Sequence, residues 1–565
     1  MIVLWIYQWH DASACIVKDW KILIHIEKER LTREKHDVWN VSECISYCLK
    51  STNLSLNDID YIATSKKVSD KSKNTIEIVE WTEYESNKEM YSEHIYKLFW
   101  IKVMWFSVPH HICHGASAYY LSWFNDASIL SMDWLWDFTA TMILKWKNNK
   151  LEVIDQYKAN VWKIWTLFCT TFWLSTVWTA WTLMALWTLG IPKYLNKFSE
   201  LYWPHEEFRL DYKRDKKEVY NEVYNWEYMY HKTATWWKGN YNFKDHDWIK
   251  YWIKEFDFIN KNNPLDKETL NVATSLQSAT NEVVNCFFNK AKKINKNVCF
   301  TWWVALNCVT NLFLKQNNES ESIFIPPFCN DSWLSVWAAL FTYYHILEKD
   351  YIPNKITNCY FWNTYNDNEI ENSISKIKDR IDFQKFSDED IILKTANLLK
   401  EWNIVWWFQD WSESWPRALG NRSILCNPWI KNMKEILNSK VKHRELYRPF
   451  APSILREYVS EWFEYDFESP FMLFVNNILE EKRNIVPSIV HLDWSARFQT
   501  VSEINNKKYY KLISQFNKLT NIPILLNTSF NDREAIVETP QDALSTFIKT
   551  NIDYLIIWNY LISKK

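Results

Sequence analysis

Apolar runs near the start of the chain predict strands. Residues 1–7 (MIVLWIY) and 21–29 (KILIHIEKE) are rich in β-branched and other apolar side chains, and the Asp19-Trp20 pair that separates them predicts a turn. We therefore expect these two runs to form a hairpin that opens an α/β domain. Further strand-like runs occupy 127–132, 139–144 and 298–301.

Other segments place apolar residues at helical spacing. The pattern predicts helices near 40–50 and 90–100, and a long amphipathic helix over 267–294 that leads into the run at 298–301. Helices that alternate with strands in this way indicate a sheet with helices on its faces. The fold class that we predict is therefore α/β.

The chain has 565 residues, which is too long for one hydrophobic core and predicts two or three domains. The polar stretch 363–372 is the best candidate for a linker. Apolar runs beyond it predict a second α/β domain, and they occupy 403–408, 489–492 and 522–526. Residues 193–262 are rich in Tyr, Lys, Asp and Glu and carry no motif that assigns a role to them.

The overall charge gives no reason to expect a nucleic-acid partner. The net charge is -2, with 47% hydrophobic and 24% charged residues, as in a globular protein. The eleven cysteines include no CxxC pair and the start resembles no secretory signal, so we expect a cytoplasmic protein. Residues 164–192 carry no charge, but seven threonines interrupt this run, and we expect buried loop and helix there instead of a membrane span.

The tryptophan and glycine contents are unusual. The chain has 37 Trp and 4 Gly, whereas glycine alone normally supplies about 7% of residues, or roughly 40 in a chain of this length. Tryptophan also follows aspartate where a turn would favour glycine, at 20, 134, 411 and 494. We hypothesise that most of these tryptophans replace glycines of the native protein, as translation of UGA codons that encode glycine would produce. A protein that is truly rich in tryptophan is the alternative.

Three histidines lie close together in the segment PHHICH. On a helix, His110 and His114 share one face, which suits two imidazoles on one metal ion, and the pair His111 and His114 is nearly as suitable. Asp331 in the segment PPFCNDSW is a candidate third ligand. Ordinary core histidines and a turn aspartate remain the alternative interpretation.

The segment TWWVALNC at 301–308 has the pattern of a strand end followed by a helix. If Trp302 and Trp303 are glycines in the native protein, the main-chain N–H groups of this turn could meet a phosphate at the helix N-terminus. Glycine-rich turns without this role are common, so the segment alone leaves nucleotide binding open.

Basic residues are concentrated in the second half of the chain. Arginine and lysine side chains at 413–423 and 442–450 alternate with Pro, Ala, Leu, Gly and Phe, which favours a buried pocket for a doubly charged oxyanion over a solvated surface. The candidates are Arg417, Arg422, Lys442, Arg444 and Arg448. Arg497, Ser529 and Asn531, in two segments that we interpret as strand-end loops, could bind an anion or a planar amide, and ordinary loop polarity is the alternative.

Together these motifs resemble the carbamoyltransferase family, which includes the nodulation-factor, cephalosporin and aminoglycoside O-carbamoyltransferases. With Trp read as Gly, family-like segments span nearly the whole chain, at 9–14, 29–37, 110–118, 302–307, 331–339, 413–423, 442–452, 491–501 and 527–531. The resemblance implies a two-lobed, actin/hexokinase-like N-terminal domain over 1–360, similar to the tRNA threonylcarbamoyl transferase. It implies a YrdC-like α/β domain over 361–565.

The resemblance also implies a reaction at two sites. The C-terminal site would take carbamoyl phosphate, release phosphate and join the carbamate to ATP, which gives carbamoyl-adenylate and pyrophosphate. The N-terminal site would pass the carbamoyl group to a hydroxyl of a small molecule or glycan. Magnesium-bound ATP and a homodimer stay open, and neither nucleic acid nor membrane is expected as a partner.

The resemblance implies a role for each candidate residue. The carbamoyl phosphate and the ATP phosphates would be held by Arg417, Lys442, Arg444, Arg448, Arg497, Ser529 and Asn531. An iron-like divalent metal would be held by His110, His114 and Asp331. The nucleotide would be approached by His10 and Lys35 and cradled by Trp302, Trp303 and Asn307.

The chain departs from the family pattern in two places. The segment Trp181-Thr-Leu-Met184 lacks the usual lysine, and 531–537 is one residue shorter than usual, with Ala535 where proline is common. Two other readings stay open: an enzyme of tRNA threonylcarbamoyl-adenosine synthesis, and a catalytically silent nucleotide-binding protein. The sequence does not identify the acceptor.

Overall fold

A computed structural model describes the chain apart from several segments, and its sheets and helices confirm the predicted α/β class. The residues that it does not describe are 9–10, 20, 39, 65–75, 78–91, 99–100, 109, 137–138, 148–149, 158–160, 162–164, 166–167, 169–183, 203–255, 257, 260–262, 264, 319–321, 352–355 and 444–447. The chain forms two compact units: Met1–Trp123 together with Ile325–Lys565, and Phe124–Phe324.

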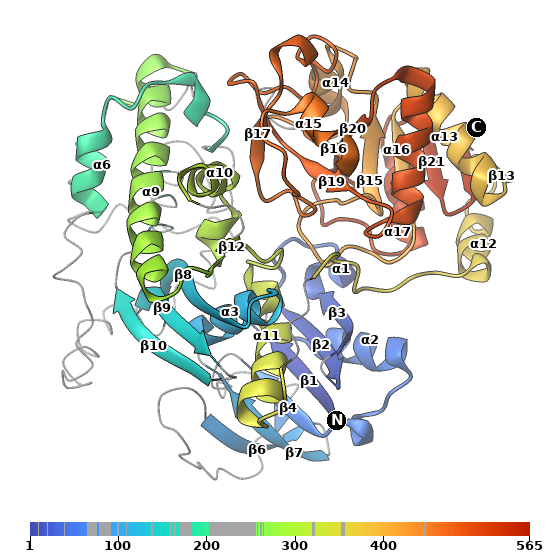
Figure 1. Ribbon diagram of the computed structural model, residues 1–565. Helices are drawn as coiled ribbons and strands as arrows, with labels where there is room; N and C mark the ends of the chain where they lie inside the picture. The colour runs from blue at the N-terminus through green and yellow to red at the C-terminus, as the bar shows by residue number, and fades with distance from the viewer. Residues whose placement is uncertain are drawn as a thin grey trace. The chain divides into compact units, whose positions relative to one another are not determined.

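The first unit contains, within its described residues, a seven-stranded sheet in the order β3-β2-β1-β4-β7-β6-β5. Its strands are β1 (Ile2–Tyr7), β2 (Ser13–Lys18), β3 (Lys21–Glu27), β4 (Tyr61–Thr64), β5 (Ile76–Glu77), β6 (Ser92–Leu98) and β7 (Ile101–Ser107). Helix α2 (Ser42–Thr52) packs on β2 and β3, and α11 (Leu334–Phe341) packs on β1, β2 and β4 (Figure 1). Both helices bury apolar side chains against the sheet.

Two expectations for this sheet were wrong. The runs at 1–7 and 21–29 do not pair directly, because β2 lies between them and pairs antiparallel with both. The helix expected near 90–100 is instead a hairpin of β6 and β7, with Ser92 opposite Ser107 and Leu98 opposite Ile101. Its β-branched and aromatic side chains favour a strand over a helix.

The first unit also contains an eight-stranded sheet of the described residues, in the order β13-β22-β21-β14-β15-β20-β16-β19. Its strands are β13 (Ile381–Lys385), β14 (Val405–Phe408), β15 (Arg422–Cys426), β16 (Ala451–Leu455), β19 (Gln499–Val501), β20 (Ile524–Ser529), β21 (Tyr554–Ile557) and β22 (Tyr560–Lys564). Of the apolar runs from which we predicted a second α/β domain, 403–408 contains β14 and 522–526 contains part of β20, whereas 489–492 lies outside any strand.

Helices accompany the eight-stranded sheet. They are α12 (Asp367–Ser375), α13 (Asp388–Lys400), α14 (Met433–Lys440), α15 (Val459–Trp462), α16 (Lys507–Thr520) and α17 (Pro540–Lys549). Helices α13 and α16 pack on each other, and a two-stranded sheet joins β17 (Val475–Asn477) to β18 (Ser495–Arg497). Helix α12 begins at Asp367, so the segment predicted as a linker is partly helical.

The second unit is built on the sheet β10-β9-β8-β11-β12, as far as its residues are described. Its strands are β8 (Asp126–Trp136), β9 (Thr139–Lys147), β10 (Lys150–Tyr157), β11 (Val298–Thr301) and β12 (Ile323–Phe324). The long green helix in Figure 1 is α9 (Lys267–Ile294), which packs on α10 (Cys308–Asn317), on β8 and on α6 (Leu195–Tyr202). The strands and the long helix predicted here are confirmed.

Helix α9 has the local signals of a stable helix at both ends. The Asp266 side chain accepts a hydrogen bond from the Glu268 N–H at the start of the helix. Lys292 and Lys293 lie in the last turn, where their positive charges interact favourably with the negative end of the helix dipole. In the part of the chain that is described, no helix has both the length and the apolar character needed to cross a bilayer.

Four tryptophans of the described chain have a backbone that favours glycine. Trp302, Trp402, Trp494 and Trp558 have φ angles of 83°, 73°, 68° and 51°. A side chain disfavours this left-handed region, and glycine does not. Trp402 follows the C-cap of α13, and Trp558 begins the two-residue loop between β21 and β22, both of which are common positions for glycine. These angles fit the hypothesis that glycine occupies these positions in the native protein.

Candidate functional site

Two histidines and an aspartate meet in the first unit. His110 and His114 lie one turn apart on α3 (His110–Tyr120), and Asp331 begins the short helix η10 (Asp331–Trp333). The Asp331 Oδ1 lies 3.4 Å from the His114 Nε2 and 3.7 Å from the His110 Nε2. All three side chains are buried, and one ligand atom from each lies within 4.8 Å of the others. Helix packing thus brings together residues that are more than 200 positions apart.

This donor set fits a divalent transition metal. Burial lowers the pKa of His114 to about 4, so its imidazole is neutral at pH 7 and can act as a ligand. Two imidazoles and one carboxylate form the ligand set that is typical of non-haem iron sites with open coordination positions. The Tyr7 hydroxyl donates to Asp331 Oδ2 at 3.1 Å, which orients the carboxylate.

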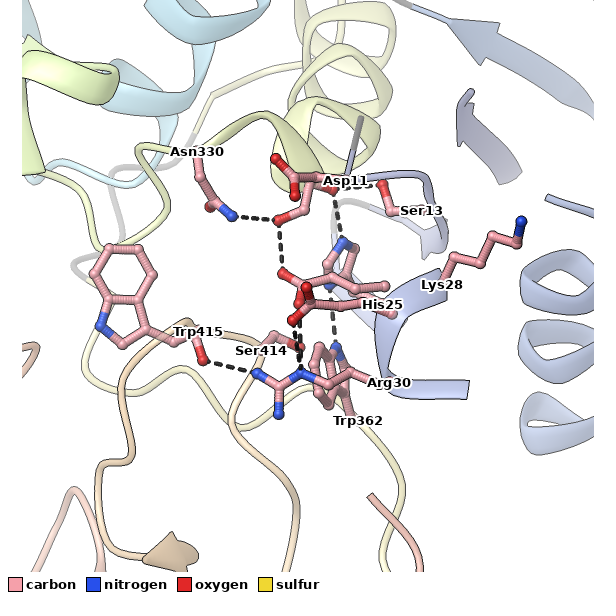
Figure 2. Close-up of polar contacts among 12 residues, drawn as sticks. Asp11, Ser13, His25, Lys28, Arg30, Asn330, Trp362, Ser414 and Trp415 are labelled. Carbon is pink, nitrogen blue, oxygen red and sulfur yellow. Dashed lines mark hydrogen bonds and ion pairs between the residues drawn. The ribbon is translucent and has the colours of Figure 1, made fainter. Parts of the chain in front are cut away.

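The loop that carries Asp331 is held by a buried polar network (Figure 2). The Ser332 hydroxyl donates to Glu27 Oε1 at 2.6 Å and accepts from Asn330 Nδ2 at 2.6 Å. The Ser332 carbonyl oxygen accepts from the Ser13 hydroxyl at 2.5 Å and lies 2.9 Å from His25 Nε2. The first sheet therefore fixes the residue next to Asp331 at several points.

A second cluster of possible ligands comes from the turn between β1 and β2, from α1 (Lys28–Thr32) and from the turn after α1. Asp11, Glu29 and His36 each offer one ligand atom within 4.8 Å of the others. His36 Nδ1 lies 2.5 Å from Asp11 Oδ1, and the main-chain N–H of His36 donates to Glu29 Oε2 at 2.9 Å. Lys35 is exposed in the turn just before His36. His10, which we expected near the nucleotide, lies outside the described residues.

Lys442 contacts two other predicted site residues. Its ammonium donates to the Ser529 carbonyl oxygen at 2.6 Å and to the Asn531 carbonyl oxygen at 2.8 Å. It also donates to Asn531 Oδ1 at 2.7 Å and lies 3.2 Å from the Ser529 hydroxyl. Lys442 lies just after α14, and Ser529 ends β20, so the sheet brings this group together.

The predicted arginines lie on separate segments of the first unit. Arg417 is half-buried in the loop before β15, Arg448 is half-buried before β16, and Arg497 ends β18. The Arg448 carbonyl oxygen accepts from Asn438 Nδ2 at 3.1 Å, which ties this segment to α14. Arg444 lies outside the described residues.

Arg422, a candidate from the basic cluster, contacts main-chain oxygens through one of its guanidinium nitrogens. Its fully buried guanidinium donates through Nη1 to the carbonyl oxygens of Gln409, Asp410 and Asn421. It also lies 3.6 Å from the centre of the Phe408 ring. These contacts make Arg422 part of the packing between β14 and β15.

The loop that carries Arg417 is folded around a buried carboxylate. Glu413 Oε1 accepts from the main-chain N–H groups of Leu419, Asn421 and Arg422 at 2.8–3.1 Å. The carboxylate thereby satisfies three main-chain donors, two in the loop before β15 and one on the first residue of β15. These hydrogen bonds explain why Glu413 is needed to fold the loop at 413–423.

In the second unit, Trp302, Trp303 and Asn307 lie between β11 and α10, as the sequence predicts. Trp302 is buried with a φ of 83°, and Trp303 begins the short helix η8 (Trp303–Leu306). Asn307 Oδ1 accepts from the N–H groups of Val309 and Thr310, and its Nδ2 donates to Gln277 Oε1 at 3.0 Å. Asn307 is therefore the N-cap of α10.

Several residues of the site region were not identified individually from the sequence. They are Tyr7, Asp11, Glu27, Glu29, Arg30, His36, Asn330, Ser332 and Glu413. Family-like segments are the one signal that could have singled some of them out, since 9–14, 29–37, 331–339 and 413–423 contain Asp11, Glu29, Arg30, His36, Ser332 and Glu413. The roles of the others depend on contacts between distant segments.

Comparisons with known proteins cover nearly the whole chain. The family model described as carbamoyltransferase N-terminus matches residues 3–340, and the model described as carbamoyltransferase C-terminus matches residues 396–564. An uncharacterised protein of Synechocystis sp. is 31% identical over 98% of this chain and 95% of its own length.

Two further relatives are nodulation proteins. Nodulation protein NolNO of Sinorhizobium fredii is 28% identical over 98% of this chain and 79% of its own length. Nodulation protein NolO of Bradyrhizobium diazoefficiens is 35% identical over 55% of this chain and 58% of its own length.

Proposed function

Because this chain belongs to the carbamoyltransferase family, and is a transferase enzyme, we propose that it is an O-carbamoyltransferase that uses carbamoyl phosphate and ATP. The acceptor would be a hydroxyl of a small molecule or glycan. The N-terminal part would have the actin/hexokinase-like fold and the C-terminal part the YrdC-like fold. The observation that carries the proposal is the contact of Lys442 with Ser529 and Asn531 in the part matched by the C-terminal family model.

In the first step, carbamoyl phosphate and water would give carbamate and phosphate, and the carbamate would attack the α-phosphorus of ATP to release pyrophosphate. Both substrates carry several negative charges, which cationic side chains must offset in a site that excludes water. Lys442 supports this role because its ammonium is mostly buried and held at a strand end by four oxygen atoms. Arg417, Arg444, Arg448 and Arg497 would supply further positive charge.

In the second step, the acceptor hydroxyl would attack the carbamoyl carbon, and AMP and a proton would leave. His110, His114 and Asp331 would hold a divalent metal, which supplies polarisation of the carbamoyl carbonyl or orientation of the acceptor. Tyr7 would keep the Asp331 carboxylate in its ligating orientation through the hydrogen bond to Oδ2. Lys35 and His10 would meet the nucleotide phosphate, and the segment from Trp302 to Asn307 would cradle the adenylate.

The test is an assay of the whole chain with ATP and carbamoyl phosphate, read as pyrophosphate release. We expect pyrophosphate only when both substrates are present, and a carbamoylated product when a suitable sugar or other hydroxylated compound is added. Threonine with tRNA forms a separate arm, because an enzyme of tRNA threonylcarbamoyl-adenosine synthesis would use those substrates. Pyrophosphate release that does not depend on carbamoyl phosphate, or transfer in the tRNA arm alone, would contradict the proposal.

A further inference from the structure

Arg30 is buried between the loop that carries Asp331 and the loop that carries Arg417. It lies in α1, and its side chain is fully inaccessible to solvent. Its Nη2 donates to the Trp415 carbonyl oxygen at 3.0 Å, two residues before Arg417 (Figure 2). The acceptor is a main-chain oxygen, so this contact does not depend on which side chain occupies position 415.

The other side of the Arg30 guanidinium faces acidic side chains. Arg30 Nε lies 3.5 Å from Glu27 Oε2 and 3.6 Å from Glu29 Oε1. Glu27 is almost fully buried, and its second oxygen, Oε1, accepts from the Ser332 hydroxyl at 2.6 Å. Since Ser332 follows Asp331 directly, a continuous line of contacts runs from the Asp331 loop through Glu27 and Arg30 to the Trp415 carbonyl.

Burying the charged side chains of Arg30 and Glu27 is energetically unfavourable if they serve only to fill space. Removing a guanidinium and a carboxylate from water carries a large desolvation penalty, which their mutual attraction offsets only in part. Apolar side chains of similar size would fill the same space without that penalty. A buried ion pair that also donates to a particular carbonyl and accepts from a particular hydroxyl instead fixes the relative positions of those groups.

We infer that Arg30 is a positioning residue that acts with Glu27 to hold the Asp331 loop, at 330–333, and the Arg417 loop, at 413–417, at a fixed separation. This inference rests on the proposed function, in which the first loop would serve the divalent metal and the second would serve carbamoyl phosphate. Binding at either loop would then depend on the same buried pair, so loss of the pair weakens binding at both loops.

The test compares Arg30→Lys with the unmodified chain in two independent measurements. The first is the KM for carbamoyl phosphate in ATP-dependent pyrophosphate release, and the second is the Kd for cobalt(II), followed by its absorption in the absence of substrates. Lysine keeps the charge but cannot reach Glu27 and the Trp415 carbonyl oxygen with one rigid fork. We expect the KM and the Kd each to rise about tenfold, while the melting temperature stays within a few degrees.

Arg456→Lys is the matched control, because it replaces a guanidinium that forms a surface ion pair with Asp466 and that belongs to neither loop. It should leave both constants unchanged. Glu27→Gln is the second variant, since the amide can still accept from Ser332 but no longer attracts Arg30, and it should raise both constants in a chain that folds.

A rise in one constant without the other, or in neither, would overturn the inference. If the unmodified chain releases no pyrophosphate from ATP and carbamoyl phosphate, the proposed function fails instead. In that case the cobalt(II) measurement still decides whether Arg30 supports the Asp331 loop.

Discussion

The Lys442 ammonium lies 2.7 Å from Asn531 Oδ1 and 2.8 Å from the carbonyl oxygen of the same residue, although 89 positions separate the two residues. Both contacts hold the ammonium at the end of β20, where the Ser529 carbonyl oxygen accepts a further hydrogen bond. A cation that is buried and surrounded by fixed oxygen atoms cannot move away from the strand end. In the function that we propose, it would offer a preorganised positive charge to an anionic substrate.

Lys442→Ala should abolish carbamoyl-phosphate-dependent pyrophosphate release, with a loss of at least about 100-fold, which corresponds to about 2.7 kcal/mol of transition-state stabilisation. The measurement is kcat/KM for carbamoyl phosphate. Lys507→Ala is the control, because Lys507 is exposed and its ammonium lies 3.9 Å from Glu503 Oε1 in a surface ion pair. Equal activity of the two variants would show that Lys442 does not contribute to the reaction.

Tyr7→Phe should weaken metal binding about tenfold without changing the ligands themselves. The hydroxyl that this variant loses donates to Asp331 Oδ2, so the carboxylate would become free to rotate away from His110 and His114. Cobalt(II) titration followed by absorption measures the change. Asp331→Ala should abolish the high-affinity site altogether, and unchanged binding by this variant would show that the metal lies elsewhere.

His25 should make the folded chain less stable in acid. Burial lowers its pKa to about 3 from the ordinary value of 6.5, so between these values the unfolded chain binds a proton that the folded chain does not. The free energy of unfolding then falls as the pH falls from 6.5 toward 3, by up to about 1.4 kcal/mol per pH unit.

The check is urea unfolding of His25→Gln at pH 4.5 and pH 7.5. Glutamine does not titrate, and its amide can still donate to the Ser332 carbonyl oxygen. The difference in unfolding free energy between the two pH values should be smaller in the variant than in the unmodified chain. An identical difference in both proteins would mean that His25 is protonated in the folded state.

The sequence pattern predicts those helices and strands whose apolar residues recur at a regular spacing within one segment. Helix α9 was predicted with its observed bounds, because its apolar stripe persists over 28 residues. The pair β6 and β7 was missed, because the run near 90–100 was assigned from helical spacing, although the β-branched and aromatic residues of the two segments favour strands. The His110 and His114 pair was visible for the same reason as α9, since both histidines lie on one helix.

Contacts between distant segments were not predictable in this way. The bond from Ser332 to Glu27 joins residues 305 positions apart, and the bond from Arg30 to Trp415 joins residues 385 apart. No periodicity in a single chain encodes such a pairing, which is decided by how the sheets and loops pack. The contact of Arg422 with the Gln409 carbonyl oxygen has the same origin, because the two residues become neighbours only when β14 and β15 pair.

Trp402→Gly should stabilise the protein by up to about 1 kcal/mol, because relief of the usual penalty of about 1–2 kcal/mol for a side chain in the left-handed region exceeds the cost of about 0.5–1 kcal/mol from the greater entropy of the unfolded chain. The φ of Trp402 is 73°, and its N–H bonds to the Leu399 carbonyl oxygen while the Asn403 N–H bonds to the Leu398 carbonyl oxygen, as at a helix end where glycine is usual. Trp402 is 62% exposed, so little packing is lost.

Trp429→Gly is the matched control for Trp402→Gly. Trp429 is 58% exposed and has no positive φ, so glycine there should destabilise the protein by about 0.5–1 kcal/mol through the greater entropy of the unfolded chain. Thermal unfolding of the two variants measures the contrast in sign. Peptide mass spectrometry of the protein from its native source should find glycine at 302, 402, 494 and 558. Tryptophan at those four positions, together with a destabilised Trp402→Gly variant, would refute the hypothesis of UGA recoding.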